Sequence, residues 1–246
     1  VIKEENVKAS HIDEKYLVPY VKSSSELQQI EFDDNYKFKA FVCQDEEKAI
    51  DKGTKSWIDK FVSALNKNGS QTIREACAGH RPYWYSLNPK RAHIITAINP
   101  YERFFFTFAK EPFVIDQRLI AMQVQDGYDV ELIAALLNSI ITFLILEMRG
   151  TSRNLGALDL NADFLKQLKI LNPTILNGKQ RDMIIKAFAP LKTRTVDSVF
   201  IEFTKEDRIN FDKIVLSCFG INADLLGSLY AIFLASVRNR INLKDN

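Results

Sequence analysis

The chain has 246 residues, of which 46% are hydrophobic and 26% charged, and its net charge is +2. This composition excludes a disordered, collagen-like or low-complexity chain, and the length allows one large domain or a smaller domain with an appendage. The near-neutral charge does not by itself indicate a nucleic-acid binder.

Alternating apolar residues dominate the start of the chain. We expect a strand at 16–22, a polar turn capped near Ser23 and a second strand at 36–43. Apolar residues at helical intervals predict a charged amphipathic helix within 45–66.

Short apolar runs occupy the chain between residues 76 and 125. The runs read PYWYSL, AHIITAI, RFFFTFA, PFVID and RLIAMQV, and the turn segments NPKR, NPYE and AKEP separate them. This spacing predicts strands of a mainly antiparallel sheet.

The most hydrophobic segment is 130–148 (VELIAALLNSIITFLILEM). It is near the lower length limit for a membrane span and contains Glu131 and Asn138, so we expect one long helix buried against the sheet, and no membrane. The next segments are the loop RGTSRNLGALDL and a short amphipathic helix, NADFLKQLKIL, capped by Asn161 or Asp163.

Amphipathic helices make up the rest of the chain, apart from a short strand that we expect at 199–203. The fold class is therefore α+β: a twisted, mainly antiparallel sheet packed with helices, followed by a helical C-terminal tail. We expect two domains, 1–173 and 174–246. The chain begins with Val1 and has no signal peptide, so we expect an excised piece of a longer polypeptide.

Several kinds of catalytic and metal site lack their sequence signals. There is no phosphate-binding loop, dinucleotide fingerprint or nucleophile elbow, and the three cysteines are isolated, as expected for reduced thiols in a cytosolic protein.

Two segments partly match catalytic motifs. Glu46-Glu47-Lys48 has the spacing of nuclease metal sites but opens a charged helix, which favours a solvated face. Asn99-Pro100-Tyr101 is similar to the NPPY tetrad of adenine methyltransferases but lacks one proline, so we interpret it as a hairpin turn.

Basic and aromatic residues interleave between residues 80 and 118. The members that we consider candidate DNA contacts are Arg81, Tyr83, Trp84, Tyr85, Lys90, Arg91 and Arg103. Arginine suits bidentate contacts with guanine or phosphate, and aromatic rings stack on bases. An ordinary sheet with an aromatic core face and a solvated arginine face is the alternative.

Two further places are candidate anion sites. The loop after the hydrophobic helix carries Arg149 and Arg153, which predicts phosphate contacts or a plain surface connector. Lys22 and Ser23 precede a helix start, where hydroxyl and N–H groups favour an anion.

In their order, these segments resemble a known family. The first half of the similarity consists of YLVPYVKSSSEL, a helix and RPYWYSL. The second half consists of LIAALLNSIITFLILEMRG, GALDL and LKQLKILNP. The chain is similar here to the C-terminal target recognition domain of type II and type IIG restriction–modification N6-adenine DNA methyltransferases. The resemblance covers about residues 16–173, and the helical tail looks like the region C-terminal to this domain in type IIG polypeptides.

The resemblance implies a cytoplasmic module that grips double-stranded DNA and reads base edges. A separate N-terminal methyltransferase domain of the same parent chain would bind S-adenosylmethionine and flip the adenine. This chain lacks the cofactor loop and the NPPY tetrad, so we expect it to bind no cofactor and to transfer no methyl group alone. The positions in the matched motifs are Lys22, Ser23, Arg81, Tyr83, Trp84, Tyr85, Arg149 and Arg153.

Other functions are compatible with the sequence. They are a stand-alone specificity subunit of a type I-like system, a protein-interaction domain without a nucleic-acid role, and an independent nuclease. The DNA site recognised, the base-reading residues, the oligomeric state and the presence of an endonuclease domain in the parent chain are left open.

The sharpest expectation concerns Arg81 and Arg153. If both face one cleft, Arg81 on a rigid strand should read a base edge, and Arg153 in a loop should contact phosphate. The alternative is an ion pair between Arg81 and Glu75 at the surface.

Overall fold

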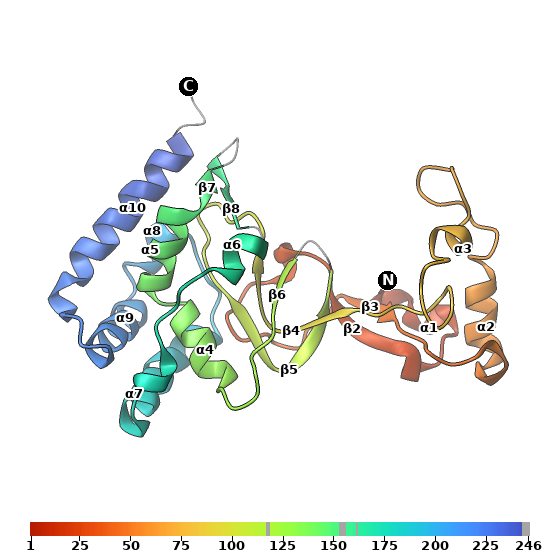
Figure 1. Cartoon of the computed structure of the whole chain (residues 1–246), viewed down its shortest axis with the longest axis horizontal. Coiled ribbons are helices and arrows are strands. Elements are labelled where there is room, and N and C mark those ends of the chain that lie inside the picture. Colours follow the sequence, from red (N-terminus) through yellow and green to blue (C-terminus); the bar gives the residue numbers. More distant parts are fainter. Residues whose placement is uncertain (117–118, 153–155, 161, 243–246) are drawn as a thin grey trace. The chain divides into compact units, whose positions relative to one another are not determined.

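The computed structural model describes residues 1–116, 119–152, 156–160 and 162–242. The chain divides into two compact units (Figure 1), here called the first and the second unit. The first unit comprises Val1–Lys22, Asn35–Arg91 and Phe113–Asp116, and the second comprises Ser23–Asp34, Ala92–Pro112 and Gln117–Asn246.

The described strands include a six-stranded sheet. In order across the sheet, its strands are β1 (Ile2–Lys3), β3 (Phe38–Phe41), β2 (Leu17–Val21), β5 (Thr107–Ile115), β4 (Lys90–Ala97) and β6 (Leu119–Met122). The pairs β1–β3, β2–β3 and β4–β6 are antiparallel, whereas β2 and β5 are parallel. The predicted α+β class with a mainly antiparallel sheet is therefore confirmed.

Two of the predicted strand boundaries are wrong. Residues 81–85, which contain most of PYWYSL, form bends and turns, and residues 86–87 are not in a strand either. The AKEP segment is not a turn, because β5 continues through it. The reason is that backbone bonds hold both ends extended: the Phe108 N–H donates to Ile30 O and the Asp116 N–H donates to Val21 O.

The first unit has short helices and small apolar clusters. Its helical segments are η1 (Glu4–Asn6), α1 (Val7–Ser10), η2 (Glu14–Tyr16), η4 (Glu47–Ala49), α2 (Lys52–Asp59) and α3 (Ile73–Ala76). The helix predicted within 45–66 is shorter than expected, because Asp51 caps it by accepting from Thr54 N. Phe41, Cys43 and Ile58 lie in the larger of the two buried clusters.

The hydrophobic segment is two helices rather than one. α4 (Val130–Leu137) and α5 (Ile140–Arg149) meet at a bend of 57°. Among the described residues no single helix is long and apolar enough to cross a membrane, although this bent pair meets the criterion by length and composition. The predicted burial is confirmed, because Leu136 and Ile140 are 0% exposed.

Asn138 explains the break between α4 and α5. Its Nδ2 donates to Ala134 O, 2.9 Å away, and to Phe106 O, also 2.9 Å away, while its Oδ1 accepts from Phe106 N at 3.0 Å. The side chain thus binds an extended segment instead of facing a continuing helix.

The described part of the second unit contains further helical segments. They are η3 (Ser24–Glu26), α6 (Ala162–Lys166), η6 (Pro173–Ile175), α7 (Gly178–Lys192), α8 (Val199–Glu202), α9 (Glu206–Cys218), η7 (Ala223–Leu225) and α10 (Leu226–Asn242), and a small hairpin is formed by β7 (Thr151–Ser152) and β8 (Leu158–Asp159). α7 packs on α9, and α10 packs on α5 (Figure 1). The strand expected at 199–203 is wrong: α8 forms there because Ser198 caps it, accepting from Phe200 N.

One apolar core joins these elements. It includes Phe106 near the sheet, Leu136 of α4, Phe188 of α7 and Phe233 of α10. Residues on both sides of position 173 therefore contribute to it, and the functional division at that position stays a prediction. Of the two expected caps of α6, Asp163 lies within the first turn of the helix and is not its cap, and Asn161 lies outside the described residues.

Candidate nucleic-acid interface

Arg81 lies on the surface of the first unit. Its Nη1 donates to Ala78 O at 3.0 Å and to His80 O at 2.8 Å, and the residue is exposed. The alternative partner, Glu75, accepts from Thr72 N and Thr72 Oγ1, both at 2.8 Å. Local carbonyl groups therefore orient the Arg81 guanidinium.

The three aromatic residues after Pro82 contact one another. The Tyr83 and Tyr85 rings are stacked at 5.3 Å, and Trp84 meets Tyr85 edge-on at 5.7 Å. The Tyr85 hydroxyl donates to Asp45 O at 2.8 Å, and burial raises the pKa of Tyr85 to about 12. Tyr85 is thus an anchored, neutral phenol, while Trp84 is half-buried.

An open hollow of about 280 Å³ adjoins this segment within the first unit. Its aromatic lining includes Phe41, Trp57, Phe61, Trp84 and Tyr85. Phe41 and Phe61 both pack on Trp57, at centroid distances of 4.8 and 4.7 Å. The sequence pattern indicated Trp84 and Tyr85, but it gave no reason to join them to α2.

The other candidate cations of the first unit, Lys22, Lys90 and Arg91, are also exposed. Lys90 and Arg91 begin β4, and Lys22 follows β2 with its Nζ 4.7 Å from the centroid of the Phe38 ring. Lys22 can keep this cation–π contact and still present its charge to solvent.

Ser23 uses its polar groups locally. Its Oγ accepts from Ser25 N at 3.1 Å, and its N–H donates to Glu26 Oε1 at 2.9 Å. The predicted cap is confirmed as a reciprocal capping box. The same bonds occupy donors that an anion would need.

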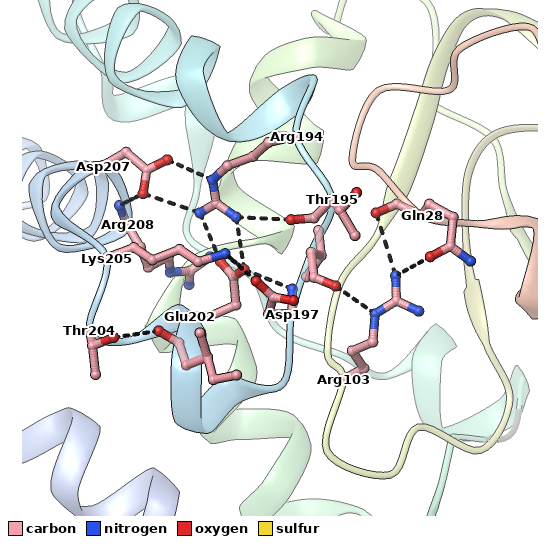
Figure 2. Close-up of polar contacts among 12 residues, drawn as sticks. Gln28, Arg103, Arg194, Thr195, Asp197, Glu202, Thr204, Lys205, Asp207 and Arg208 are labelled. Carbon is pink, nitrogen blue, oxygen red and sulfur yellow. Dashed lines mark hydrogen bonds and ion pairs between the residues drawn. The ribbon is translucent and has the colours of Figure 1, made fainter.

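Arg103 also bonds within the chain. Its Nε donates to Val196 O at 2.7 Å, and its Nη2 donates to Gln28 Oε1 at 3.3 Å (Figure 2). The same Nη2 also donates to Leu27 O at 3.2 Å. Burial lowers the pKa of Arg103. The guanidinium therefore joins two segments of the second unit.

The two arginines predicted to contact phosphate after the hydrophobic segment are Arg149 and Arg153. Arg149 is the exposed last residue of α5. Arg153 lies outside the described residues. The cleft that we expected Arg153 to share with Arg81 therefore stays a prediction. The roles of both arginines stay predictions.

A charged network that the sequence analysis missed lies in the second unit (Figure 2). Arg194 makes a bidentate contact with Glu202, both N–O distances being 2.8 Å, and its Nε donates to Asp207 Oδ2 at 2.6 Å. Lys205 Nζ contacts Asp197 Oδ2 and Glu202 Oε1, each at 2.7 Å. The loop between α7 and α8 brings Arg194 to these acids, and no helical spacing could have indicated it.

The network shifts the titration of Glu202. Burial alone would raise the pKa of this carboxyl, but hydrogen bonds from Arg194, Lys205 and the Asp197 N–H prevail and lower its pKa to about 2. Glu202 is therefore an anion at neutral pH, and it accepts from three donors although it is buried.

A buried carboxylate, Asp212, binds the main chain at the break between α4 and α5. Asp212 is 0% exposed, and its Oδ1 accepts from Ile140 N at 2.9 Å. Its Oδ2 accepts from Arg208 Nε at 2.9 Å and from the Tyr230 hydroxyl at 2.7 Å. Asp212 thus joins α5, α9 and α10.

Arg240 of α10 organises the end of the NPY segment. It pairs with Glu147 at 2.8 Å and donates to Tyr101 O at 2.8 Å and to Gly156 O. Leu158 N–H donates to Pro100 O at 2.9 Å. Hydrogen bonds to Pro100 O and Tyr101 O thus hold the Asn99-Pro100-Tyr101 segment against β8 and α10.

The described residues contain no group of three or more His, Cys, Asp or Glu side chains that could hold a metal ion. Glu47 pairs with Lys55 at 2.9 Å, and Glu46 pairs with Lys48 at 2.7 Å. The two carboxylates of the Glu46-Glu47-Lys48 triplet are exposed and paired with lysines, as expected of a solvated face.

Comparison with known proteins gives a structural match but no match by sequence. No protein-family model and no curated protein sequence matches the chain. Its structure is similar to the crystal structure of the type IIG restriction endonuclease BpuSI, with a TM-score of 0.65 and 9% identity over 98% of this chain. The chain corresponds to 28% of the length of that protein, so its fold resembles a part of a type IIG restriction enzyme.

Proposed function

We propose that this chain is the DNA target recognition region of a type IIG restriction–modification adenine-N6 methyltransferase. The observation that carries the proposal is the structural similarity to BpuSI over 98% of the chain. It supports the relation that the segment order from residue 16 to residue 173 indicated independently. Reading of a DNA sequence by this part of the molecule is our inference.

The exposed cations of the first unit are the best candidates for the DNA contact. Lys22, Arg81, Lys90 and Arg91 belong to one compact unit and are exposed. Lysine and arginine on phosphates give affinity, while arginine on base edges gives specificity. We assign base reading to Arg81 and phosphate contact to Lys90 and Arg91.

The remaining chemistry of the enzyme belongs to other parts of the parent chain. An N-terminal domain would bind S-adenosylmethionine and transfer the methyl group in the cytoplasm, while this region holds double-stranded DNA. Tyr83 and Tyr85 support the segment that carries Arg81. Arg149 and Arg153 are further candidates for phosphate contacts.

Fluorescence anisotropy with a labelled duplex tests the proposal over a series of salt concentrations. We expect log affinity to fall linearly with log salt, with a slope of about −0.9 for each phosphate contact. Replacing both Lys90 and Arg91 by Ala should reduce the slope by about 2.

The matched control replaces two exposed lysines of the same unit, Lys48 and Lys52, by Ala. It removes the same charge, so an equal effect of both pairs would contradict the assigned interface. Absence of duplex binding at low salt would favour a protein-interaction domain. Transfer of labelled methyl groups to DNA by this chain alone would contradict the division of labour.

A further inference from the structure

The aromatic hollow of the first unit has no role in the duplex contacts proposed above. Of its lining residues, Phe41 is buried, whereas Trp57, Phe61, Trp84 and Tyr85 are half-buried. Phenylalanine is among the residues most often fully buried, while tryptophan and tyrosine more often keep some exposed surface. These rings therefore keep accessible surface around a concave space.

The polar groups around the hollow suit a heterocycle better than an aliphatic ligand. Among the described residues, neither the Trp57 nor the Trp84 indole N–H has a hydrogen-bond acceptor, and His80 also lines the space. Indole N–H donors complement the ring nitrogens and carbonyl groups of a nucleobase.

The size of the hollow limits the ligand. Its volume of about 280 Å³ lies just below the range of about 300–1,000 Å³ that is usual for sites of drug-sized ligands. One planar ring system with its attached sugar is therefore a suitable occupant. Stacking on aromatic side chains accepts any base, because every base has a π face.

We propose that the hollow binds one unpaired nucleobase of DNA, held against Trp57 and Trp84. The inference rests on the proposed function and adds to it, because exposed cations contact paired DNA whereas this site takes a base that has left the stack. The cost of unstacking is smallest for a base that is already unpaired, which the site would therefore favour.

Intrinsic fluorescence gives a direct readout, because Trp57 and Trp84 are the two tryptophans of the chain and both line the hollow. The probes are a fully paired duplex, the same duplex with one bulged thymine, and the bulged duplex with an abasic residue in place of that thymine. We expect saturable quenching and the tightest binding with the bulged thymine. The abasic probe should bind roughly 5- to 150-fold more weakly, as expected for the loss of one base–aromatic stack.

Two substitutions at one position separate stacking from packing. Trp84→Phe keeps an aromatic face, and Trp84→Leu keeps an apolar side chain without one. We expect Trp84→Phe to retain the preference for the bulged thymine over the abasic probe, and Trp84→Leu to lose most of it, with similar unfolding temperatures for both. Tyr128→Leu, at an exposed aromatic residue of the second unit, is the control and should leave the preference unchanged.

Equal binding of the bulged and abasic probes would overturn the inference. So would an equal loss in Trp84→Phe and Trp84→Leu, or a preference that both variants retain in full. In each of these cases the paired duplex can still bind with a steep salt dependence, so the proposed function would stand. Failure of every probe to bind at low salt would instead contradict the proposed function.

Discussion

The two units differ in how deeply they bury arginine side chains. In the second unit, Arg194 and Arg240 make several hydrogen bonds to carboxylate and carbonyl groups, and Arg240 is buried. In the first unit, Arg74, Arg81 and Arg91 are all exposed. The side-chain type is the same, but the surroundings differ. An arginine-rich stretch therefore indicates an interface only after its internal partners are known.

The difference follows from the size of the cores. The second unit buries Glu202, Arg208, Asp212 and Arg240, and a buried charge needs a partner because its desolvation is costly. The first unit has small clusters, and its buried polar residues are the uncharged Thr54 and Ser86. Charge substitutions should therefore affect stability in the second unit and DNA binding in the first.

The largest expected effect is at Asp212. Asp212→Ala leaves Arg208 buried without its carboxylate and removes the acceptor for Ile140 N, so the free energy of unfolding should fall by about 3–5 kcal/mol. Urea denaturation measures it. Tyr230→Phe, which removes a single hydroxyl bond to the same carboxylate, is the control and should cost about 0.5–1.5 kcal/mol. Equal losses would contradict the central role of Asp212.

Glu202 should make stability depend on acid pH. Its folded pKa of about 2 lies below the ordinary value of 4.5, so its contribution is complete above the ordinary value and is lost as the pH falls toward 2. The pKa difference corresponds to about 3 kcal/mol. The difference in unfolding free energy between the wild-type protein and Glu202→Gln should therefore shrink between pH 6 and pH 2. A constant difference would show that the carboxylate charge is not responsible.

A smaller effect is expected at Arg103. Arg103→Met keeps much of the apolar stem but removes the bonds to Val196 O, Leu27 O and Gln28. We expect a loss of about 1.5–3 kcal/mol in unfolding free energy, the usual range for hydrogen bonds of a charged group. Affinity for duplex DNA, measured well below the unfolding temperature, should change little. A large loss of affinity in a stably folded variant would restore Arg103 as a DNA contact.

Arg81 should show the opposite pattern. Arg81→Ala removes two bonds to exposed backbone carbonyls, so stability should change by no more than about 0.5 kcal/mol. Within the parent enzyme, discrimination at one base pair of the recognition site should weaken by about 1–3 kcal/mol. Arg81→Lys keeps the charge but not the bidentate geometry, so it should retain general affinity and lose the discrimination. A uniform loss over all sequences would make Arg81 a phosphate contact.

The sequence nominated the candidate site residues to different degrees. Tyr83, Trp84 and Tyr85 were nominated because aromatic residues concentrate beside Arg81, and their role stays a prediction, but the strand expected there is wrong. Trp57 was assigned only to a helix face, since nothing local indicates that α2 and residues 80–87 line one hollow. Arg103 and Arg81 could not be told apart in the sequence. What distinguishes them is that Arg103 is partly buried and bonds to carbonyl groups of residues 27, 28 and 196, which only the folded chain brings near it.

Patterns among residues close in the sequence were enough to predict part of the fold. Alternating apolar residues predicted β2 and β3, helical periodicity predicted α7, α9 and α10, and the Ser23–Glu26 spacing predicted a cap. Each signal depends on neighbours within a few residues. Tertiary structure decided the break at Asn138, whose side chain binds Phe106, 32 residues away in the chain. It also decided which arginines are buried and which remain exposed, because desolvation and long-range partners exist only in the folded chain.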